Sequence, residues 1–398
     1  MRLLYFDPAL KSHAGHNATY CDAITHGFKS IGIETLIFGS NHVDNDLQQS
    51  MQVSPFFKAS PFDQPSSDPL CGGLLNYFQV SKEIAQDLIH LDNLLPNDLM
   101  YFVAATPAAL MGVMRYVEKM GSVAPKLIID LVDKADVTRS TNNKNEFILT
   151  ANSINPSLWR YTVSDKKIDS KKIQLISYEK IFADIYSALL NLPVNKIPHP
   201  ISPLPKKTII NPKLVLGFLG FQSLPKGIKL IPGIVQRILS LANGPSILVH
   251  DCSNHQGPEI QFLKNLSLDN RPLILDLASK NKERWAETLL SCDLVIAPYD
   301  AKVYGSCGSG IAHECLANGI PMITTANTSA ADLLRELNLD DLVVEEYSEN
   351  AFFEKVKYFL INSHSIKKRF VDAQLIWSAR NNSVLSTQSI LKLYQGMA

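Results

Sequence analysis

A segment rich in glycine and serine in the second half of the chain has residue types that suit a phosphate and a diol. Residues 293–321 read DLVIAPYDAKVYGSCGSGIAHECLANGIP, which predicts a buried strand, a Gly/Ser loop and a helix that begins near Ser309 and Gly310 and carries Glu314. The free N–H groups and positive dipole end of a helix N-terminus suit a phosphate. Glu314, about one turn deeper, can accept hydrogen bonds from a diol such as a ribose. The segment predicts a site for a nucleotide diphosphate joined to a second group, which we interpret as a sugar.

Other polar residues of the second half are placed to complete this site. Lys226 follows an expected strand and Gly220, and a cation there would stabilise the charge that develops on a diphosphate leaving group. His250 ends another strand and is predicted to line the base pocket, and Tyr299 flanks the phosphate loop. The plainer alternatives are a solvated carboxylate for Glu314, an ordinary helix lysine for Lys226 and a core aromatic residue for Tyr299.

Two groups of residues in the first half could act on a second substrate, an acceptor of the sugar. In the loop after the first expected strand, Gly15 allows close backbone approach to the donor, His16 is a candidate base and His13 a candidate acceptor ligand. A helix-capping loop with exposed histidines is the alternative. Asp130 and Asp133 end a later strand, and carboxylates at the C-terminal ends of parallel strands face the ligand crevice. We predict that they bind the acceptor, with a surface-loop role as the alternative.

Strands and helices alternate along the chain, which indicates βαβ units and parallel sheets. In the first half we expect strands at residues 3–6, 34–38, 100–104, 126–131 and 196–198 and helices at residues 15–30, 73–91, 107–120 and 173–190. In the second half we expect strands at residues 214–219, 247–250, 273–275, 294–297, 322–324 and 342–344 and helices at residues 227–241, 283–291, 309–318, 351–361, 366–378 and 384–394. The predicted fold class is α/β, with two Rossmann-like, doubly wound parallel-sheet domains and a cleft between them.

A proline-rich run separates the two halves. Residues 198–205 contain four prolines, which cannot continue a helix or a central strand and indicate a stiff linker. We predict an N-terminal domain over residues 1–202, a linker over residues 203–212 and a C-terminal domain over residues 213–378. Residues 379–398 are predicted to form a terminal helix that packs back on the N-terminal domain.

This organisation resembles the GT-B fold glycosyltransferases, and the second half resembles the large retaining family of bacterial polysaccharide enzymes, the group 1 glycosyl transferases. The matching pieces are the strand before Gly220, the loop to Lys226, the strand end at residues 297–299, the loop and helix to Glu314, residues 319–321 and Trp377 in a late helix. The resemblance covers nearly the whole chain in architecture and is specific over about residues 214–325.

The resemblance implies that the first domain, residues 1–202, binds the acceptor and that the second domain, residues 213–378, binds a nucleotide diphosphate sugar. Glu314 would hold the nucleotide ribose and Lys226 the donor phosphates. The amides of Ser309, Gly310 and Ile311 would stabilise the diphosphate leaving group.

Three positions depart from the family pattern. The family usually carries a second glutamate eight positions before the helix glutamate, where Ser306 stands in this chain. It tends to have an arginine shortly after the glycine that matches Gly220, where Phe221 and Gln222 follow here. The family's frequent histidine after the fourth strand is missing at residues 104–107. These differences would fit a different donor, a different stereochemical outcome or reduced activity.

The composition narrows the class of protein. The 398 residues are 46% hydrophobic and 19% charged, which indicates a globular chain of two domains, and a net charge of zero argues against a general nucleic-acid binder. Six scattered cysteines form no Cys-x-x-Cys pair and fit a reducing cytosol. The chain has no apolar run near the ~20 residues of a membrane span and no signal-peptide pattern at its start. We expect a cytoplasmic protein, either free or at the inner face of the membrane, where the lysines at residues 166–172 would meet anionic lipid unless they lie in a solvated loop.

The resemblance implies a glycosyltransferase that moves a sugar from a nucleotide diphosphate sugar to an acceptor hydroxyl in bacterial glycan or glycoconjugate biosynthesis. Family likeness favours retention of configuration and a hexosyltransferase-like enzyme with no cofactor and no metal. The Asp-x-Asp pattern of Asp44 and Asp46 is interpreted as a coincidence. Saccharide, lipid-linked and protein acceptors stay open, as does a homo-oligomer. The alternatives are a GT-B nucleotide-sugar 2-epimerase and a non-catalytic GT-B subunit that stabilises an active partner.

Overall fold

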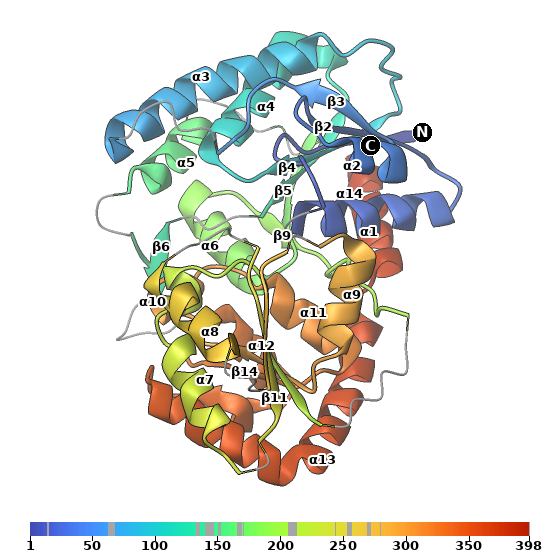
Figure 1. Cartoon of the computed structure of the whole chain (residues 1–398). Coiled ribbons are helices and arrows are strands. Elements are labelled where there is room, and N and C mark those ends of the chain that lie inside the picture. Colours follow the sequence, from blue (N-terminus) through green and yellow to red (C-terminus); the bar gives the residue numbers. More distant parts are fainter. Residues whose placement is uncertain are drawn as a thin grey trace. The chain divides into compact units, whose positions relative to one another are not determined.

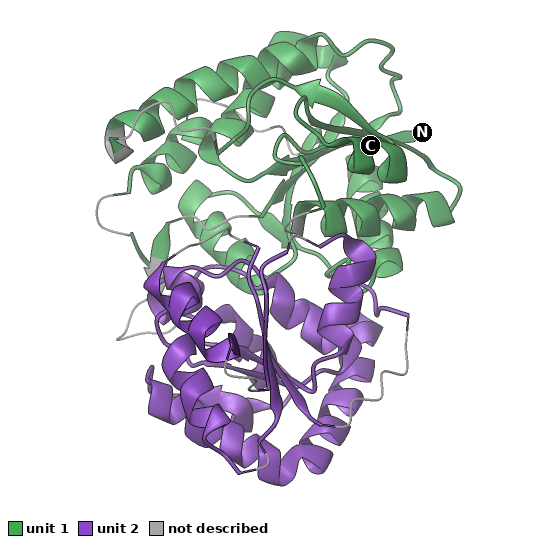
Figure 2. Cartoon of the chain, viewed as in Figure 1, with its two compact units in different colours: residues 1–200, 381–398 green, residues 201–380 purple. Residues whose placement is uncertain are grey.

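The computed structural model divides the chain into two units, each with its own sheet and core (Figure 2). Unit 1 comprises Met1–Pro200 and Asn381–Ala398, and unit 2 comprises Ile201–Arg380. The described residues are 1–13, 16–62, 68–132, 136–139, 147–149, 153–164, 169, 171–205, 213–242, 244–252, 257–268, 272–278 and 280–397, with the backbone alone at residues 16, 69, 70, 138 and 139.

Unit 1 is built on a sheet of seven described parallel strands in the order β3-β2-β1-β4-β5-β8-β9 (Figure 1). Its strands are β1 (Arg2–Phe6), β2 (Glu34–Ser40), β3 (Val53–Phe57), β4 (Leu99–Ala104), β5 (Lys126–Leu131), β8 (Ile173–Ser177) and β9 (Val194–Lys196), and a separate antiparallel pair joins β6 (Val137–Arg139) to β7 (Phe147–Leu149). Its helices are α1 (His16–Ser30), α2 (Asn45–Met51), α3 (Pro69–Ile89), α4 (Pro107–Met120), η1 (Gly121–Val123), α5 (Asn155–Ser164), α6 (Lys180–Leu190) and α14 (Ser383–Gly396).

The two faces of this sheet bury separate groups of side chains, because successive residues of a strand point to opposite faces. In β1, Leu4 and Phe6 join a core with residues of α3 and α4, whereas Leu3 and Tyr5 join a core with residues of α1 and α14. The central strand β4 is buried at all its positions, as a strand covered on both faces requires.

The terminal helix α14 belongs to unit 1 and packs against α1. A Cβ added to Gly27 of α1 would lie 2.2 Å from Thr387 Oγ1 and 2.8 Å from the Ser383 carbonyl oxygen, so the two helices approach closely there. The Lys126 ammonium also lies 4.6 Å from the centre of the Tyr394 ring. The end of the chain therefore forms part of the helix layer that covers one face of the N-terminal sheet.

Unit 2 has a sheet of six described parallel strands in the order β12-β11-β10-β13-β14-β15. Its strands are β10 (Val215–Phe218), β11 (Ser246–His250), β12 (Leu273–Asp276), β13 (Leu294–Ala297), β14 (Met322–Thr325) and β15 (Val343–Val344). Its helices are η2 (Leu224–Lys226), α7 (Ile231–Leu239), α8 (Pro258–Leu268), α9 (Lys282–Leu290), α10 (Ala301–Tyr304), α11 (Gly310–Asn318), α12 (Ser329–Glu336), η3 (Asp340–Leu342) and α13 (Glu349–Arg380). The long helix α13 is interrupted at Asn362, whose backbone is not helical, and the sequence pattern predicted two helices there.

The prediction of a single helix over residues 173–190 is wrong, because its first part is strand β8. Ile173 and Leu175 join one core of unit 1 and Ile176 joins the other, which is the alternation of a strand buried on both faces. The register places Ile173 beside Leu127 of β5, and a helix begins only at Lys180. The sequence pattern also missed β3, α5, α8 and α12. Among the described residues, no helix is both long and apolar enough to cross a membrane.

Candidate functional site

The loop after β10 places Lys226 by close contact with the end of β13. Gly227 has φ +78°, and a Cβ there would lie 1.9 Å from the carbonyl oxygen of Pro298, so the loop accepts only glycine at this position. The Asp300 N–H donates to the Pro225 carbonyl at 2.8 Å. These contacts fix the backbone on both sides of Lys226 at the C-terminal edge of the sheet.

The ammonium of Lys226 lies over the glycine that ends this strand. Its Nζ is 3.6 Å from the position that a Cβ on Gly220 would take, and Gly220 has φ +102°. Burial lowers the pKa of Lys226, and the nearby Glu314 and Asp251 carboxylates act in the opposite direction. A half-buried cation at a strand edge is suited to an anion that supplies the missing negative charge.

Glu314 lies on α11 and is buried at 5% exposure. The indole N–H of Trp285 on α9 donates to its Oε2 at 3.0 Å. Burial raises the pKa of Glu314 to about 7, and the Trp285 hydrogen bond and the charge of Lys226 limit the rise. A cation and a buried carboxylate from different elements therefore meet at the same edge of the sheet of unit 2.

The N-terminus of α11 is held by a side-chain cap. Ser309 Oγ accepts from the Ala312 N–H at 3.2 Å and lies 3.0 Å from the Tyr299 hydroxyl. The ring of Tyr299 stacks on that of Tyr304, with centroids 4.1 Å apart, and burial raises the pKa of Tyr299. The first N–H groups of a helix have no acceptor within it, so the amides at the start of α11 are available to an anion.

His250 anchors the same loop rather than projecting into open space. Its Nδ1 accepts from the Gly220 N–H at 3.4 Å, and its Nε2 donates to the Ala278 carbonyl at 3.0 Å. Burial lowers the pKa of His250, which fits a neutral ring with its proton on Nε2. Gln222, which stands near the position of the family's arginine, is also buried: its backbone N–H donates to Asp251 and its side chain donates to the His250 carbonyl.

Unit 1 holds a second buried carboxylate at the C-terminal edge of its sheet. The Tyr101 hydroxyl donates to Asp130 Oδ2 at 2.6 Å and forms a short hydrogen bond with the Tyr178 hydroxyl. Burial raises the pKa of Asp130 to about 7, and the carboxylate of Asp7 also raises it. The other oxygen of Asp130 is buried and has no hydrogen-bond partner among the described residues.

The other predicted residues of unit 1 are placed as follows. His13 Nε2 lies 3.2 Å from Ser50 Oγ and 3.5 Å from Asp46 Oδ2, both on α2. His16 begins α1, with its backbone alone described, whereas Gly15 and Asp133 lie outside the described residues. The Asp44 side chain caps α2, which is a structural use of the Asp-x-Asp pattern.

Of the lysines at residues 166–172 that we considered for a lipid surface, Lys172 has local partners, as does the nearby Lys180. Lys172 Nζ donates to the carbonyls of Gly121 and Ser122 at 3.1 and 2.8 Å. Lys180 pairs with Asp184 one helical turn away at 2.5 Å. Lys166 and Lys167 lie outside the described residues.

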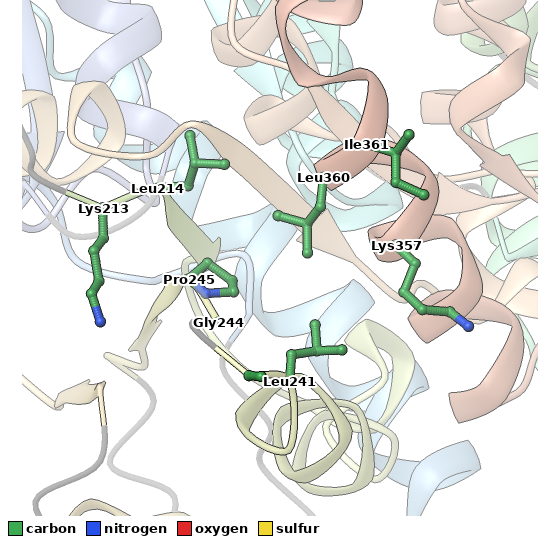
Figure 3. A pocket seen from close by; sticks show the side chains of 9 residues that line it. Lys213, Leu214, Leu241, Gly244, Pro245, Lys357, Leu360 and Ile361 are labelled. Atoms are coloured by element: carbon green, nitrogen blue, oxygen red, sulfur yellow. The ribbon is translucent and has the colours of Figure 1, made fainter.

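A pocket of about 550 Å³ opens at the opposite end of the sheet of unit 2 (Figure 3). It is lined by residues that precede β10 and β11 and by residues of α13: Lys213, Leu214, Leu241, Ala242, Gly244, Pro245, Lys357, Leu360 and Ile361. Ligands of doubly wound sheets bind at the carboxyl ends of the strands. Lys357 at this pocket pairs with Glu354 at 2.7 Å. Because the pocket lies at the other end of the strands, we place the candidate ligand site beside α11 instead.

Two residues of these strand edges were not predicted from the sequence. Trp285 lies four positions after Asn281, the cap of α9, but only the fold shows that its indole reaches Glu314. Asp7 directly follows β1, accepts from Asn17 at 2.8 Å and is buried, which raises its pKa to about 6. The rule that strand-end carboxylates face the crevice could have found Asp7, whereas no local signal marked Trp285.

Comparisons with known proteins support the fold. No protein-family model matches the chain, and no curated protein matches it in sequence. Sucrose-phosphate synthase from Thermosynechococcus elongatus is similar in structure, with a TM-score of 0.70, 11% identity and coverage of 100% of this chain and 99% of that one. A glycosyltransferase from Rickettsia africae gives a TM-score of 0.66 and 12% identity over 100% and 98% of the two chains. Anabaena HepE, solved with UDP-glucose, gives a TM-score of 0.63 and 14% identity over 100% of both chains.

These similarities confirm the predicted fold class. The chain has the GT-B fold of glycosyltransferases, with two Rossmann-like α/β units.

Proposed function

We propose that this protein is a glycosyltransferase that moves a sugar from a nucleotide diphosphate sugar to an acceptor hydroxyl. The observation that carries the proposal is the meeting of Lys226, Glu314 and the capped N-terminus of α11 at one strand edge of unit 2. A cation and helix amides suit a diphosphate, and a buried carboxylate beside them suits the hydroxyls of a ribose. The GT-B fold supports this assignment.

Each donor-side group has a role in the proposed transfer. As the bond between the sugar and the diphosphate breaks, negative charge develops on the leaving phosphate. Lys226 and the amides of Ser309, Gly310 and Ile311 stabilise that charge. Glu314 binds the ribose and so fixes the position of the diphosphate relative to Lys226. His250 and Tyr299 act by holding the loop and the start of α11 in place.

Unit 1 supplies the acceptor side of the proposal. Asp130 binds an acceptor hydroxyl, and His16 takes the hydroxyl proton as the base. We propose retention of configuration, a route without a metal or other cofactor, and a place in bacterial glycan or glycoconjugate biosynthesis. The family resemblance is the support for these finer assignments, and Ser306, in place of a second glutamate, is one of the positions that depart from the family pattern.

A ligand screen followed by a product assay tests the proposal. A thermal-shift screen with UDP-, GDP-, dTDP- and CMP-sugars should raise the melting temperature with at least one donor, because a ligand that binds the folded state stabilises it. With that donor, release of the nucleoside diphosphate should depend on an added acceptor. Conversion of the donor to its epimer without acceptor would contradict transfer, and the absence of binding by every donor would contradict the whole proposal.

A further inference from the structure

The contact between Trp285 and Glu314 joins two helices of unit 2 at the candidate site. Trp285 Nε1 donates to Glu314 Oε2 at 3.0 Å, and no hydrogen bond to Oε1 is found within the described part of the chain. Each oxygen of a carboxylate can accept hydrogen bonds. The indole therefore occupies one oxygen of Glu314 and leaves the other for a ligand.

The position of Trp285 is fixed from several directions. Helix α9 begins at a capped N-terminus, where the Asn281 side chain accepts from the Arg284 N–H at 3.1 Å, and Leu289 of the same helix is fully buried. The His250 ring lies against the indole, with centroids 5.6 Å apart. Trp285 is itself half-buried, so part of its side chain is in contact with the interior of unit 2 and part is exposed at the candidate site.

We propose that Trp285 is a positioning residue for ribose recognition, which holds one carboxylate oxygen of Glu314 so that the other meets a ribose hydroxyl of the nucleotide sugar. This inference rests on the proposed function, because it assigns a new part in the same donor site. The hydrogen bond limits the rotation of the Glu314 side chain, so less conformational entropy is lost when the ligand binds.

The same bond acts on the charge of Glu314. A donated hydrogen bond favours the ionised carboxylate, which accepts from hydroxyl groups, over the protonated one. The other titratable groups that face Glu314 are Lys226 from the loop after β10, Tyr299 from the end of β13 and the neighbouring Cys315. Of these only Lys226 carries a charge that favours the carboxylate, so Trp285 and Lys226 together oppose the effect of burial.

Calorimetric binding of UDP-glucose between pH 5.5 and 8.5 tests this inference. UDP-glucose is the probe because, unlike UDP, it has no terminal phosphate that titrates in this range. Ionised Glu314 binds the ribose, so the affinity of the wild-type protein should fall as the pH falls through about 7. Trp285→Phe removes the donor, so it should weaken binding about tenfold at pH 7 and move the midpoint of the profile up by about one pH unit.

Two further variants separate positioning from packing. Trp377→Phe makes the same change at a core tryptophan of unit 2 and should leave the midpoint where it is. Glu314→Gln has no carboxylate to titrate, so its profile should be flat, and adding Trp285→Phe to it should weaken binding by less than about threefold.

The outcomes distinguish the two proposals. If Trp285→Phe leaves the midpoint unchanged, or if its loss of affinity is the same with and without Glu314→Gln, then Trp285 only packs and the positioning role is overturned. If the wild-type protein binds neither UDP-glucose nor any other sugar nucleotide, the proposed function fails, and the inference fails with it.

Discussion

Two buried carboxylates, one in each unit, differ in the charge that faces them. Asp130 of unit 1 and Glu314 of unit 2 both have pKa values raised to about 7, and burial is the main cause for each. The charged neighbour of Asp130 is a second carboxylate, Asp7, whereas that of Glu314 is the ammonium of Lys226. Similar burial thus leads to different chemistry.

The hydrogen-bond donors sharpen this difference. Asp130 accepts from Tyr101, whose hydroxyl also bonds to that of Tyr178, so hydroxyls around it can pass or share a proton. Glu314 accepts from an indole N–H, which can only donate, and lies beside a cation. Both sets of hydrogen bonds favour the ionised carboxylate, but the nearby charge opposes it at Asp130 and favours it at Glu314. This difference in charge supports our proposal that unit 2 binds the donor and unit 1 the acceptor.

The largest expected effect comes from removing the carboxylate of unit 2. Glu314→Ala deletes the ribose acceptor and should weaken binding of UDP-glucose by roughly 100-fold, because hydrogen bonds to a charged group are among the stronger ones. Calorimetry measures the loss. The exposed Glu346→Ala in the same unit is the matched control and should bind as the wild type does. Equal affinity for Glu314→Ala and the control would remove the ribose role.

The next effect concerns the loop that holds the cation. Gly227→Ala would place a Cβ 1.9 Å from the Pro298 carbonyl oxygen at a backbone φ of +78°. We expect unit 2 to lose roughly 2 kcal/mol of stability, because the loop must move away from β13. Thermal unfolding measures this, and binding of UDP-glucose should fall with it as Lys226 shifts. Gly32→Ala in unit 1 is the control, because Gly32 also has a φ of +78° but an added Cβ would have nothing within 4 Å. It measures the cost of the backbone conformation alone, without the steric clash.

Asp130 of unit 1 should make the free energy of unfolding depend on pH. The pKa of Asp130 is about 7 in the folded protein against 3.8 ordinarily, so between these values the folded state holds a proton that the unfolded state has lost. The free energy of unfolding should therefore fall as the pH rises from about 4 to 7.

Asp130→Asn removes this contribution and provides the measurement. Relative to the wild type, the variant should become more stable by roughly 4 kcal/mol as the pH rises across that window. Comparing the two proteins cancels the similar contribution of Asp7, whose pKa is also raised. A difference in melting temperature that does not change with pH would show that Asp130 is ionised in the folded protein.

The smallest expected effect is at the cap of α11. Tyr299→Phe removes the hydroxyl that lies 3.0 Å from Ser309 Oγ and should cost about 1 kcal/mol of stability, the usual value of a neutral hydrogen bond. Affinity for UDP-glucose should change by less than about threefold, because Ser309 still caps the helix through the Ala312 N–H. A loss as large as that of Glu314→Ala would place the tyrosine hydroxyl on the ligand itself.

Local patterns in the sequence predicted the elements that position the proposed donor site. The helix from Gly310 with its Ser309 cap, and the strand before it, follow from capping residues and an apolar run. The error at residues 173–190 has a physical cause: the strand and the helix there are separated by two residues without glycine or proline, so the apolar pattern runs on.

Contacts between distant residues could not be predicted in this way. Trp285 and Glu314 are 29 positions apart and meet only when α9 and α11 pack on the same sheet. Likewise, the requirement for glycine at position 227 arises from Pro298, which belongs to another strand end. Local propensity carries no information about such pairs, so the sequence predicted candidate residues but not their partners.

One pair of variants tests the donor site most directly. Lys226 and Lys229 lie three positions apart after the same strand, but Lys226 is half-buried beside Gly220 whereas Lys229 is exposed. Calorimetry with UDP-glucose should show Lys226→Ala weakened by roughly 30-fold and Lys229→Ala unchanged, because only the first removes a cation from the diphosphate. Equal affinities for the two variants, with the wild type binding normally, would contradict the placement of the donor phosphates in unit 2.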